Sequence, residues 1–287
     1  NATLSISKIF VGIIAGSIAV LGDGIDSATD VVISIVTLFT ARIVTRPPNN
    51  NYAYGYEKAD TIAAKVLSFV IFFAGMQMLI SSGKNILFAV PRDLPSIIAI
   101  YVTLFSMIGK LGLAYYQFRQ GKLAGSPMLI ANAKNMRNDV IISAGVLVGL
   151  FFTFYLDMPI LDSITGLLIS LYIIRSAINI FMESNVALMD GVKDTSIYNK
   201  IFEAVEKVPG ACNPHRVRSR QIGNMYMIVL DIETDGELTL NEAHEIADNV
   251  EVSIKQNIEN VYDIVVHIEP IGKHHSEEKF GLNRDIL

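Results

Sequence analysis

The sequence predicts an α-helical membrane domain with six transmembrane helices, followed by a small soluble α+β domain. Its 287 residues are 51% hydrophobic and only 18% charged, with a mean hydropathy of +0.43, which is too apolar for a soluble chain of this size. Apolar runs fill residues 1–190, whereas the remainder is rich in charge. We therefore expect a membrane domain at 1–190 and a soluble domain at 191–287.

Six segments meet the length of about 20 mostly apolar residues that a membrane-spanning helix needs. They are residues 4–21, 24–44, 59–88, 94–116, 131–155 and 160–188. Residues that favour turns separate them, at 22–24, 46–51, 91–93, 121–127 and 157–159. The first of these turns places Asp23 at the outer end of span two, where we expect it to cap the helix.

The distribution of basic residues predicts the orientation in the membrane. Six spans put both termini on one side. The loops on that side hold most of the basic residues, which are Arg42, Arg46, Lys58, Arg119 and Lys122, and the other side offers Lys84 and Arg92. Because basic loops stay inside, we expect a multi-pass protein of the cell or inner membrane with both termini and the soluble domain in the cytoplasm.

The soluble half shows alternating helix and strand patterns. Residues 195–208 have helical periodicity, and 216–222 and 225–234 alternate as two strands of a hairpin around Gly223 and Asn224. A second helical pattern follows at 241–258, and 262–268 resembles a last strand. The order αββαβ predicts a two-layer domain of ferredoxin-like kind.

Charge and cysteine content exclude some partners. A net charge of −5 and a pI near 5.6 give no basic field for nucleic acid. The single cysteine, Cys212, cannot form an intramolecular disulfide.

Acidic residues inside the predicted spans indicate a metal site. Asp26 and Asp30 of span two are four residues apart, and so are Asn135 and Asp139 of span five, so each pair stacks on one helix face. A buried acid needs a polar partner, an ion or water. If the two faces meet, three carboxylates and an amide oxygen surround one point, which suits a divalent cation.

A simpler explanation is that each acid pairs with a basic neighbour such as Lys134 or Arg137. Two matching pairs in different spans favour the metal site over such ion pairs.

Four segments of the sequence are similar to the cation diffusion facilitators, membrane proteins that export divalent metals against protons. These segments are LGDGIDSATD in span two, NAKNMRND in span five, YGYEKAD in the loop between spans two and three, and MESNVALMDG at the end of span six. The resemblance covers nearly the whole chain. It implies six spans, a cytoplasmic αββαβ domain, a homodimer in membrane lipid, and metal/proton antiport by alternating access.

The resemblance also places the transport site on Asp26, Asp30, Asn135 and Asp139. Zinc-type members commonly have His where this chain has Asn135, and the set found here is similar to that of the manganese-exporting branch. An amide with three carboxylates suits a hard ion. Mn²⁺ is therefore the expected substrate, with Fe²⁺ or a broad Zn²⁺, Co²⁺ and Cd²⁺ range as the alternative.

The resemblance implies a two-metal regulatory site in the cytoplasmic domain as well. It falls on His215, Asp231, His244, His267 and Glu269. On a strand, residues two apart face one side, so His267 and Glu269 could bind one ion together. The alternative is that these are ordinary surface residues of a solvated domain. Mn²⁺, Zn²⁺ and Fe²⁺ are the candidate ligands.

Two further positions can be compared with the family. A metal site in the loop between spans two and three would fall on Asn49, Tyr52 and Tyr56, which are poor divalent ligands, so we expect none there. Lys58 and Asp190 match an intersubunit or interhelix charge pair that holds the family's dimer near the membrane surface. The alternative is that each is a free, solvated charge that contributes little.

Other classes of protein are less consistent with the sequence. Asp23-Gly24 followed by further acids is similar to the motif of membrane CDP-alcohol phosphotransferases, but the Ala-Arg pair expected just after is missing. An intramembrane aspartyl protease needs two apposed catalytic Asp, and Asn135 beside Asp139 argues against it. We therefore expect no enzyme and no catalytic cofactor. A further alternative is a membrane metal sensor that binds ions but does not transport them.

Overall fold

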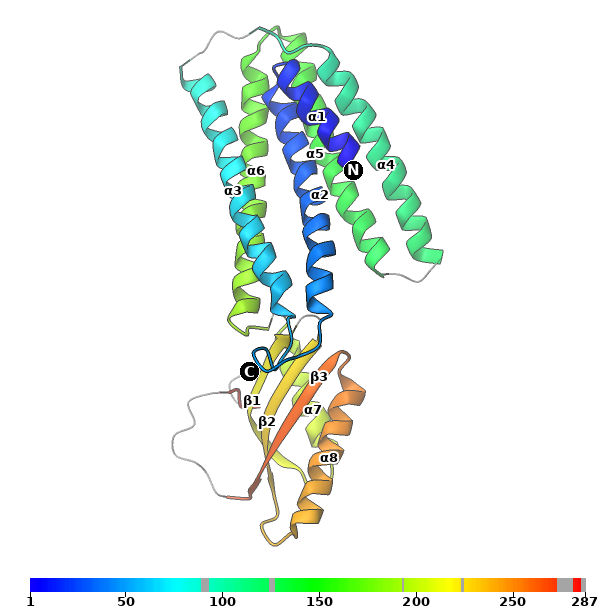
Figure 1. Ribbon diagram of the computed structural model, residues 1–287, viewed down its shortest axis with the longest axis vertical. Coiled ribbons are helices and arrows are strands. Elements are labelled where there is room, and N and C mark those ends of the chain that lie inside the picture. Colours follow the sequence, from blue (N-terminus) through cyan, green and yellow to red (C-terminus); the bar gives the residue numbers. More distant parts are fainter. Residues whose placement is uncertain (89–92, 124–126, 193, 223–224, 273–280, 285–287) are drawn as a thin grey trace. The chain divides into compact units, whose positions relative to one another are not determined.

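The computed structural model describes the chain except for residues 89–92, 124–126, 193, 223–224, 273–280 and 285–287, and except for the side chains of 121 and 127–132 (Figure 1). The described chain forms two compact units. The helical unit comprises Asn1–Arg42 and Ala63–Met182, and the α/β unit comprises Ile43–Ile62 and Glu183–Leu287.

Six apolar helices precede the α/β fold, as the sequence predicts. They are α1 (Ala2–Ile14), α2 (Ile18–Val44), α3 (Lys58–Leu87), α4 (Ile98–Leu123), α5 (Pro127–Tyr155) and α6 (Ile160–Leu188). Among the described residues, five of these helices are long and apolar enough to cross a membrane, whereas α1 is a shorter apolar helix of 13 residues.

The predicted turn at 22–24 is wrong, because these residues lie inside α2. The chain instead turns between α1 and α2 around Gly16, whose φ of 68° suits glycine. The Oγ of Ser17 accepts a hydrogen bond from the backbone N–H of Val20 at 3.1 Å, and a carboxylate oxygen of Asp162 accepts one from Ile18 at 2.7 Å. These two side chains cap α2.

The glycines of that segment allow close helix packing. A Cβ at Gly24 would lie 2.9 Å from the backbone nitrogen of Ile9 in α1, and one at Gly22 would lie 2.6 Å from the Cε of Met78 in α3. The cap predicted for Asp23 is wrong for the same reason, since Asp23 is buried in the interior of α2.

The α/β unit has the predicted αββαβ order. It comprises α7 (Ser196–Glu206), β1 (Cys212–Ile222), β2 (Met225–Thr234), α8 (Leu240–Asn257) and β3 (Val261–Pro270). The sheet order is β1-β2-β3, with β1 and β2 antiparallel and β2 and β3 parallel. The predicted hairpin turn at Gly223 and Asn224 lies outside the described residues.

Both helices of this unit pack against the sheet through one hydrophobic core (Figure 1). Phe202 of α7, Leu230 of β2 and Ile254 of α8 are among its fully buried members. The core holds the three strands in fixed register, which decides where their polar side chains lie.

The helix α8 begins with a capping box. The Oγ1 of Thr239 accepts a hydrogen bond from the N–H of Glu242, and the carboxylate of Glu242 accepts one from the N–H of Thr239 at 2.8 Å. Thr195 occupies the corresponding position of α7 but makes no side-chain cap bond. The two threonines therefore form a matched pair for testing.

We predict that Thr239→Ala lowers the free energy of opening the first turn of α8 by about 0.5–2 kcal/mol, the usual contribution of such a cap. Hydrogen exchange of the detergent-solubilised protein measures this value at the amides that follow Thr239. Thr195→Ala is the control and should leave exchange in α7 unchanged. Equal effects of the two variants on hydrogen exchange would contradict the assignment of Thr239 as the cap of α8.

The stabilisation of α8 by this capping box should depend on pH. Hydrogen bonds from the backbone and the hydroxyl of Thr239 lower the pKa of Glu242 below its ordinary value of 4.5. A lowered pKa in the folded state means that the stabilisation is complete above the ordinary value and is lost as the pH falls through the lowered one. Exchange at the start of α8 should therefore accelerate, relative to Glu242→Gln, only below about pH 4.5. A difference between the variants that persists unchanged to pH 2 would contradict this.

Candidate metal sites

Three of the predicted transport-site acids come together between α2 and α5. Asp26 and Asp30 lie one turn apart on α2 and are half-buried, and Asp139 of α5 is buried. The side chains of Asp30 and Asp139 share a hydrogen bond, and Asp26 interacts electrostatically with Asp139. Asn135 lies one turn before Asp139 on α5, with its side chain exposed.

A lysine that the sequence analysis did not identify lies against these acids. The Nζ of Lys110, on α4, is 2.8 Å from the Oδ2 of Asp139 and 3.0 Å from the Oγ of Ser27 on α2. The side chain of Lys110 is 1% exposed. Lys110 therefore connects α4 to both helices that carry the acids.

A second buried lysine pairs with Asp23. The Nζ of Lys8, on α1, is 2.7 Å from the Oδ2 of Asp23 and 3.0 Å from the Oγ of Ser143. The hydroxyl of Ser143 donates to the other carboxylate oxygen of Asp23 at 2.9 Å. A lysine within a span is as costly as an acid, so the presence of Lys8 and Lys110 in predicted spans was a signal that each needs a polar partner, although it does not show which one.

The simpler explanation of the buried acids, that each pairs with a basic neighbour, therefore holds for Asp139. Asp139 does pair with a base, but the base is Lys110 of another helix, whereas Lys134 and Arg137 are exposed on α5. One lysine faces three acids here, so ion pairing leaves part of the negative charge unbalanced.

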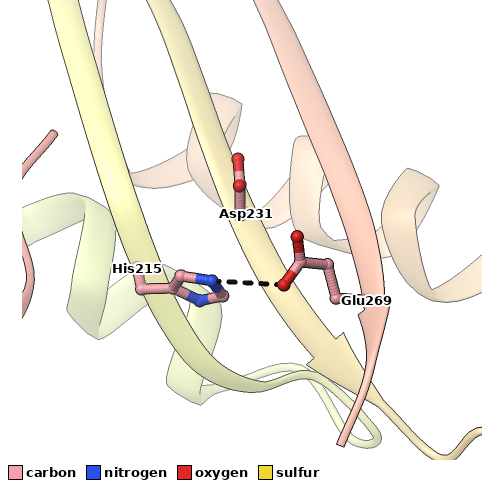
Figure 2. A group of neighbouring side chains, drawn as sticks. All are labelled: His215, Asp231 and Glu269. Atoms are coloured by element: carbon pink, nitrogen blue, oxygen red, sulfur yellow. Dashed lines mark ion pairs between the residues drawn. The ribbon is translucent and has the colours of Figure 1, made fainter. Parts of the chain in front are cut away.

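A second cluster lies on the sheet of the α/β unit. His215 of β1, Asp231 of β2 and Glu269 of β3 each offer one ligand atom, and these atoms lie within 4.8 Å of one another (Figure 2). All three residues are buried. The register explains the grouping, since His215 is the Cα partner of Asp231 across β1 and β2. The Nε2 of His215 is 3.5 Å from the Oε2 of Glu269.

The two other predicted histidines differ in position. The Nε2 of His267 is 3.3 Å from the Oε1 of Glu269, at the edge of the cluster. His244 lies on α8 with its side chain 73% exposed, and its Nε2 is 3.7 Å from a carboxylate oxygen of Asp248. Within one chain, the structure thus brings together His215, Asp231, Glu269 and His267, and it does not bring His244 to them.

The donor set of the cluster fits a borderline divalent ion. One imidazole nitrogen and two carboxylate oxygens are typical ligands of Zn²⁺ and its neighbours in the transition series. Arg216 already pairs with Asp231, its Nη1 being 2.7 Å from the Oδ2. A bound ion would share Asp231 with this guanidinium or displace it.

The remaining predicted positions lie near the start of α3. The Nζ of Lys58 is 2.6 Å from the Oδ1 of Asp190, and both side chains are 43% exposed. In the loop before α3, the side-chain amide of Asn49 donates to the hydroxyl of Tyr56 at 2.7 Å. The ring of Tyr52 lies 4.7 Å from that of Tyr56.

Apolar helices with buried acids, followed by an αββαβ domain with a His and carboxylate cluster, are the features of a membrane cation transporter. The family model of the cation efflux transmembrane domain matches residues 1–189, and that of the cation efflux protein cytoplasmic domain matches 194–271. The chain therefore belongs to the cation diffusion facilitator family, integral membrane proteins that transport divalent metal cations.

Individual relatives span nearly the whole chain. The uncharacterized transporter YdbO of Bacillus subtilis is 34% identical over 272 residues, which cover 93% of this chain and 91% of that protein. The manganese efflux system protein MneS of the same organism is 30% identical over 271 residues, with the same coverage. The magnetosome protein MamM of Magnetospirillum gryphiswaldense is 27% identical over 269 residues, covering 94% and 85%.

A solved structure resembles the cytoplasmic part alone. The metal-bound C-terminal domain of the CzcD transporter from Thermotoga maritima is 35% identical, covers 28% of this chain and 93% of that chain, and has a TM-score of 0.27.

The geometry of the cytoplasmic cluster leads to a prediction for Glu269. Glu269→Gln removes a carboxylate that lies between two histidines, so Zn²⁺ should bind the cytoplasmic domain at least roughly tenfold more weakly, since even a supporting group around a metal is worth that much. Calorimetric titration of residues 191–287 measures this. Asp263→Asn is the control, because Asp263 is an exposed acid of the same strand. Equal affinities of the two variants would exclude Glu269 as a ligand.

Proposed function

We propose that the protein exports divalent metal ions, with Mn²⁺ as the main substrate, in exchange for protons. The observation that carries the proposal is the grouping of Asp26, Asp30 and Asp139 between two apolar helices. Carboxylate oxygens are the ligands that hard divalent ions prefer. The names of MneS and of MneP, which is 25% identical over 276 residues, describe manganese efflux system proteins and support this substrate.

Exchange follows from the chemistry of the site. A carboxylate binds a dication only when it has lost its proton, so metal and protons compete for the same oxygens. No histidine belongs to the proposed site, and the exchanging groups are therefore Asp26, Asp30 and Asp139. Alternating access then requires the site to face the two sides of the membrane in turn, with protons loaded where the metal leaves.

Asn135 completes the proposed site and sets its preference. Its amide oxygen is neutral and hard, and a zinc site at this place would gain from an imidazole. Fe²⁺, or a broad Zn²⁺, Co²⁺ and Cd²⁺ range, is the second candidate. FieF of Pectobacterium atrosepticum, whose name describes a cation-efflux pump and no particular ion, is 27% identical over 269 residues. A membrane metal sensor that does not transport is the remaining alternative, and a flux measurement separates it from a transporter.

The two parts of the chain have different proposed roles. Residues 1–190 carry the ion, and residues 191–287 form a cytoplasmic domain that binds regulatory metal at His215, Asp231, His244, His267 and Glu269 and joins two chains. Because His244 lies apart from the cluster in one chain, its share in this site would come through the dimer. The Lys58 and Asp190 pair would help to hold the dimer together near the membrane surface. Both termini are proposed to be cytoplasmic, and no enzymatic activity is proposed.

The transport site can be tested with isosteric variants. We predict that Asp26→Asn, Asp30→Asn and Asp139→Asn each reduce Mn²⁺ flux into proteoliposomes to the level of protein-free vesicles, because each removes a charged ligand. Asp157→Asn is the control, since Asp157 is an exposed acid of the turn before α6 and its φ of 53° suits Asn. Wild-type flux in Asp30→Asn and Asp139→Asn would refute the site.

Selectivity can be tested at one position. Asn135→His supplies an imidazole, so competition for transport should shift toward Zn²⁺ relative to Mn²⁺. The measurement is the ratio of KM values for the two ions in matched vesicles. Asn138→His, on the same helix and also exposed, is the control and should leave the ratio unchanged. An unchanged ratio in Asn135→His would show that selectivity lies elsewhere.

A further inference from the structure

Among the described residues, Lys110 is the one basic side chain that forms an ion pair with an acid of the proposed transport site, and that acid is Asp139. Its Nζ lies 2.8 Å from Asp139 and 3.0 Å from Ser27, the residue that follows Asp26. Lys110 also interacts electrostatically with Asp26 and Asp30. The ammonium group is therefore part of the electrostatic environment of the whole site.

The formal charges of these groups balance the charge of one dication. Three carboxylates and one ammonium together carry a net charge equal and opposite to that of a single divalent ion. Without the ammonium, the loaded site would keep an excess negative charge in an apolar bundle, where unbalanced charge is costly. The ammonium also forms an ion pair with the Oδ2 of Asp139, which is one of the oxygens that could bind a metal.

The other buried lysine shows that this arrangement is specific. Lys8 forms an ion pair with one carboxylate oxygen of Asp23, and the other oxygen accepts a hydrogen bond from Ser143. The pair of Lys8 and Asp23 has no net charge. The pair of Lys110 and Asp139 has Asp30 in addition, hydrogen-bonded to Asp139. Lys8 also acts electrostatically on Asp26, but less strongly than Lys110 does. Lys8 therefore balances mainly Asp23, whereas Lys110 pairs with an acid of the group.

We propose that Lys110 is a built-in counter-cation of the transport site, which weakens metal binding enough to permit release. This inference rests on the proposed function. The ammonium repels the dication and competes with it for Asp139, so it lowers affinity while it keeps the loaded site neutral. A transporter must release its ion, and a site of three carboxylates without this charge would hold a dication too tightly for rapid turnover.

The test is the steady-state kinetics of Mn²⁺ flux for the full-length protein in proteoliposomes. Lys110→Met and Lys110→Gln should lower KM by roughly tenfold or more, since a unit charge a few ångströms away in a partly buried site has a large effect on a dication. They should lower kcat as well, because release slows. Lys110→Arg keeps the charge and should retain a KM close to that of the wild type.

Two controls separate this effect from a general disturbance of the helices. Lys122→Met removes an exposed ammonium from the same helix, where Lys122 lies over the ring of Phe118. Lys8→Met also leaves a buried Asp without its lysine, but at Asp23. Lys122→Met should leave KM unchanged, and Lys8→Met should lower KM much less than the neutral Lys110 variants do, because Lys8 acts on Asp26 more weakly than Lys110.

The outcomes are distinct. A lower KM with a lower kcat in the neutral Lys110 variants, and neither in Lys110→Arg, supports the proposal. An unchanged or raised KM in folded Lys110→Gln overturns it, and so does failure of Lys110→Gln to fold, which would show that the ammonium serves the fold. If the wild type itself shows no saturable Mn²⁺ flux, the proposed function fails instead.

Discussion

The need to balance buried charge governs the helical unit. Apolar helices cannot carry a lone carboxylate without a partner, because an ionised group in such surroundings is costly. Each fully or largely buried acid of this unit accordingly has a defined partner: Asp23 has Lys8, Asp139 has Lys110, and Asp162 accepts hydrogen bonds from Ser17 and the start of α2. Asp26 and Asp30 are only half-buried and gather around Asp139.

These partners also fix how the helices pack. Lys8 links α1 to α2 and α5, and Lys110 links α4 to the same two helices. Gly22 and Gly24 then allow α1 and α3 to approach α2 closely. The helices α2 and α5, which carry the acids, are thus held by buried lysines from α1 and α4. A rearrangement that opened the site would have to carry these ion pairs along or exchange their partners.

The periodicity of the sequence predicted most of the fold. The six helices, the αββαβ order and the two pairs of polar residues four apart follow from regular spacing, which local chemistry determines. The first turn was misplaced because glycine favours both turns and close helix contacts, and at Gly22 and Gly24 packing decides. Only the fold could show that Lys110, distant in sequence, contacts Asp139, or that His244 lies apart from His215 within one chain.

The location of a bound Mn²⁺ ion tests the central claim most directly. Anomalous X-ray scattering at the manganese absorption edge, from crystals of the full-length protein grown with Mn²⁺, would place the ion independently of any kinetic assumption. The proposed site predicts an anomalous peak between α2 and α5 within bonding distance of Asp26, Asp30 and Asp139, and its loss in crystals of Asp139→Asn. A peak elsewhere among the six helices, or one that persists there in Asp139→Asn, would contradict it.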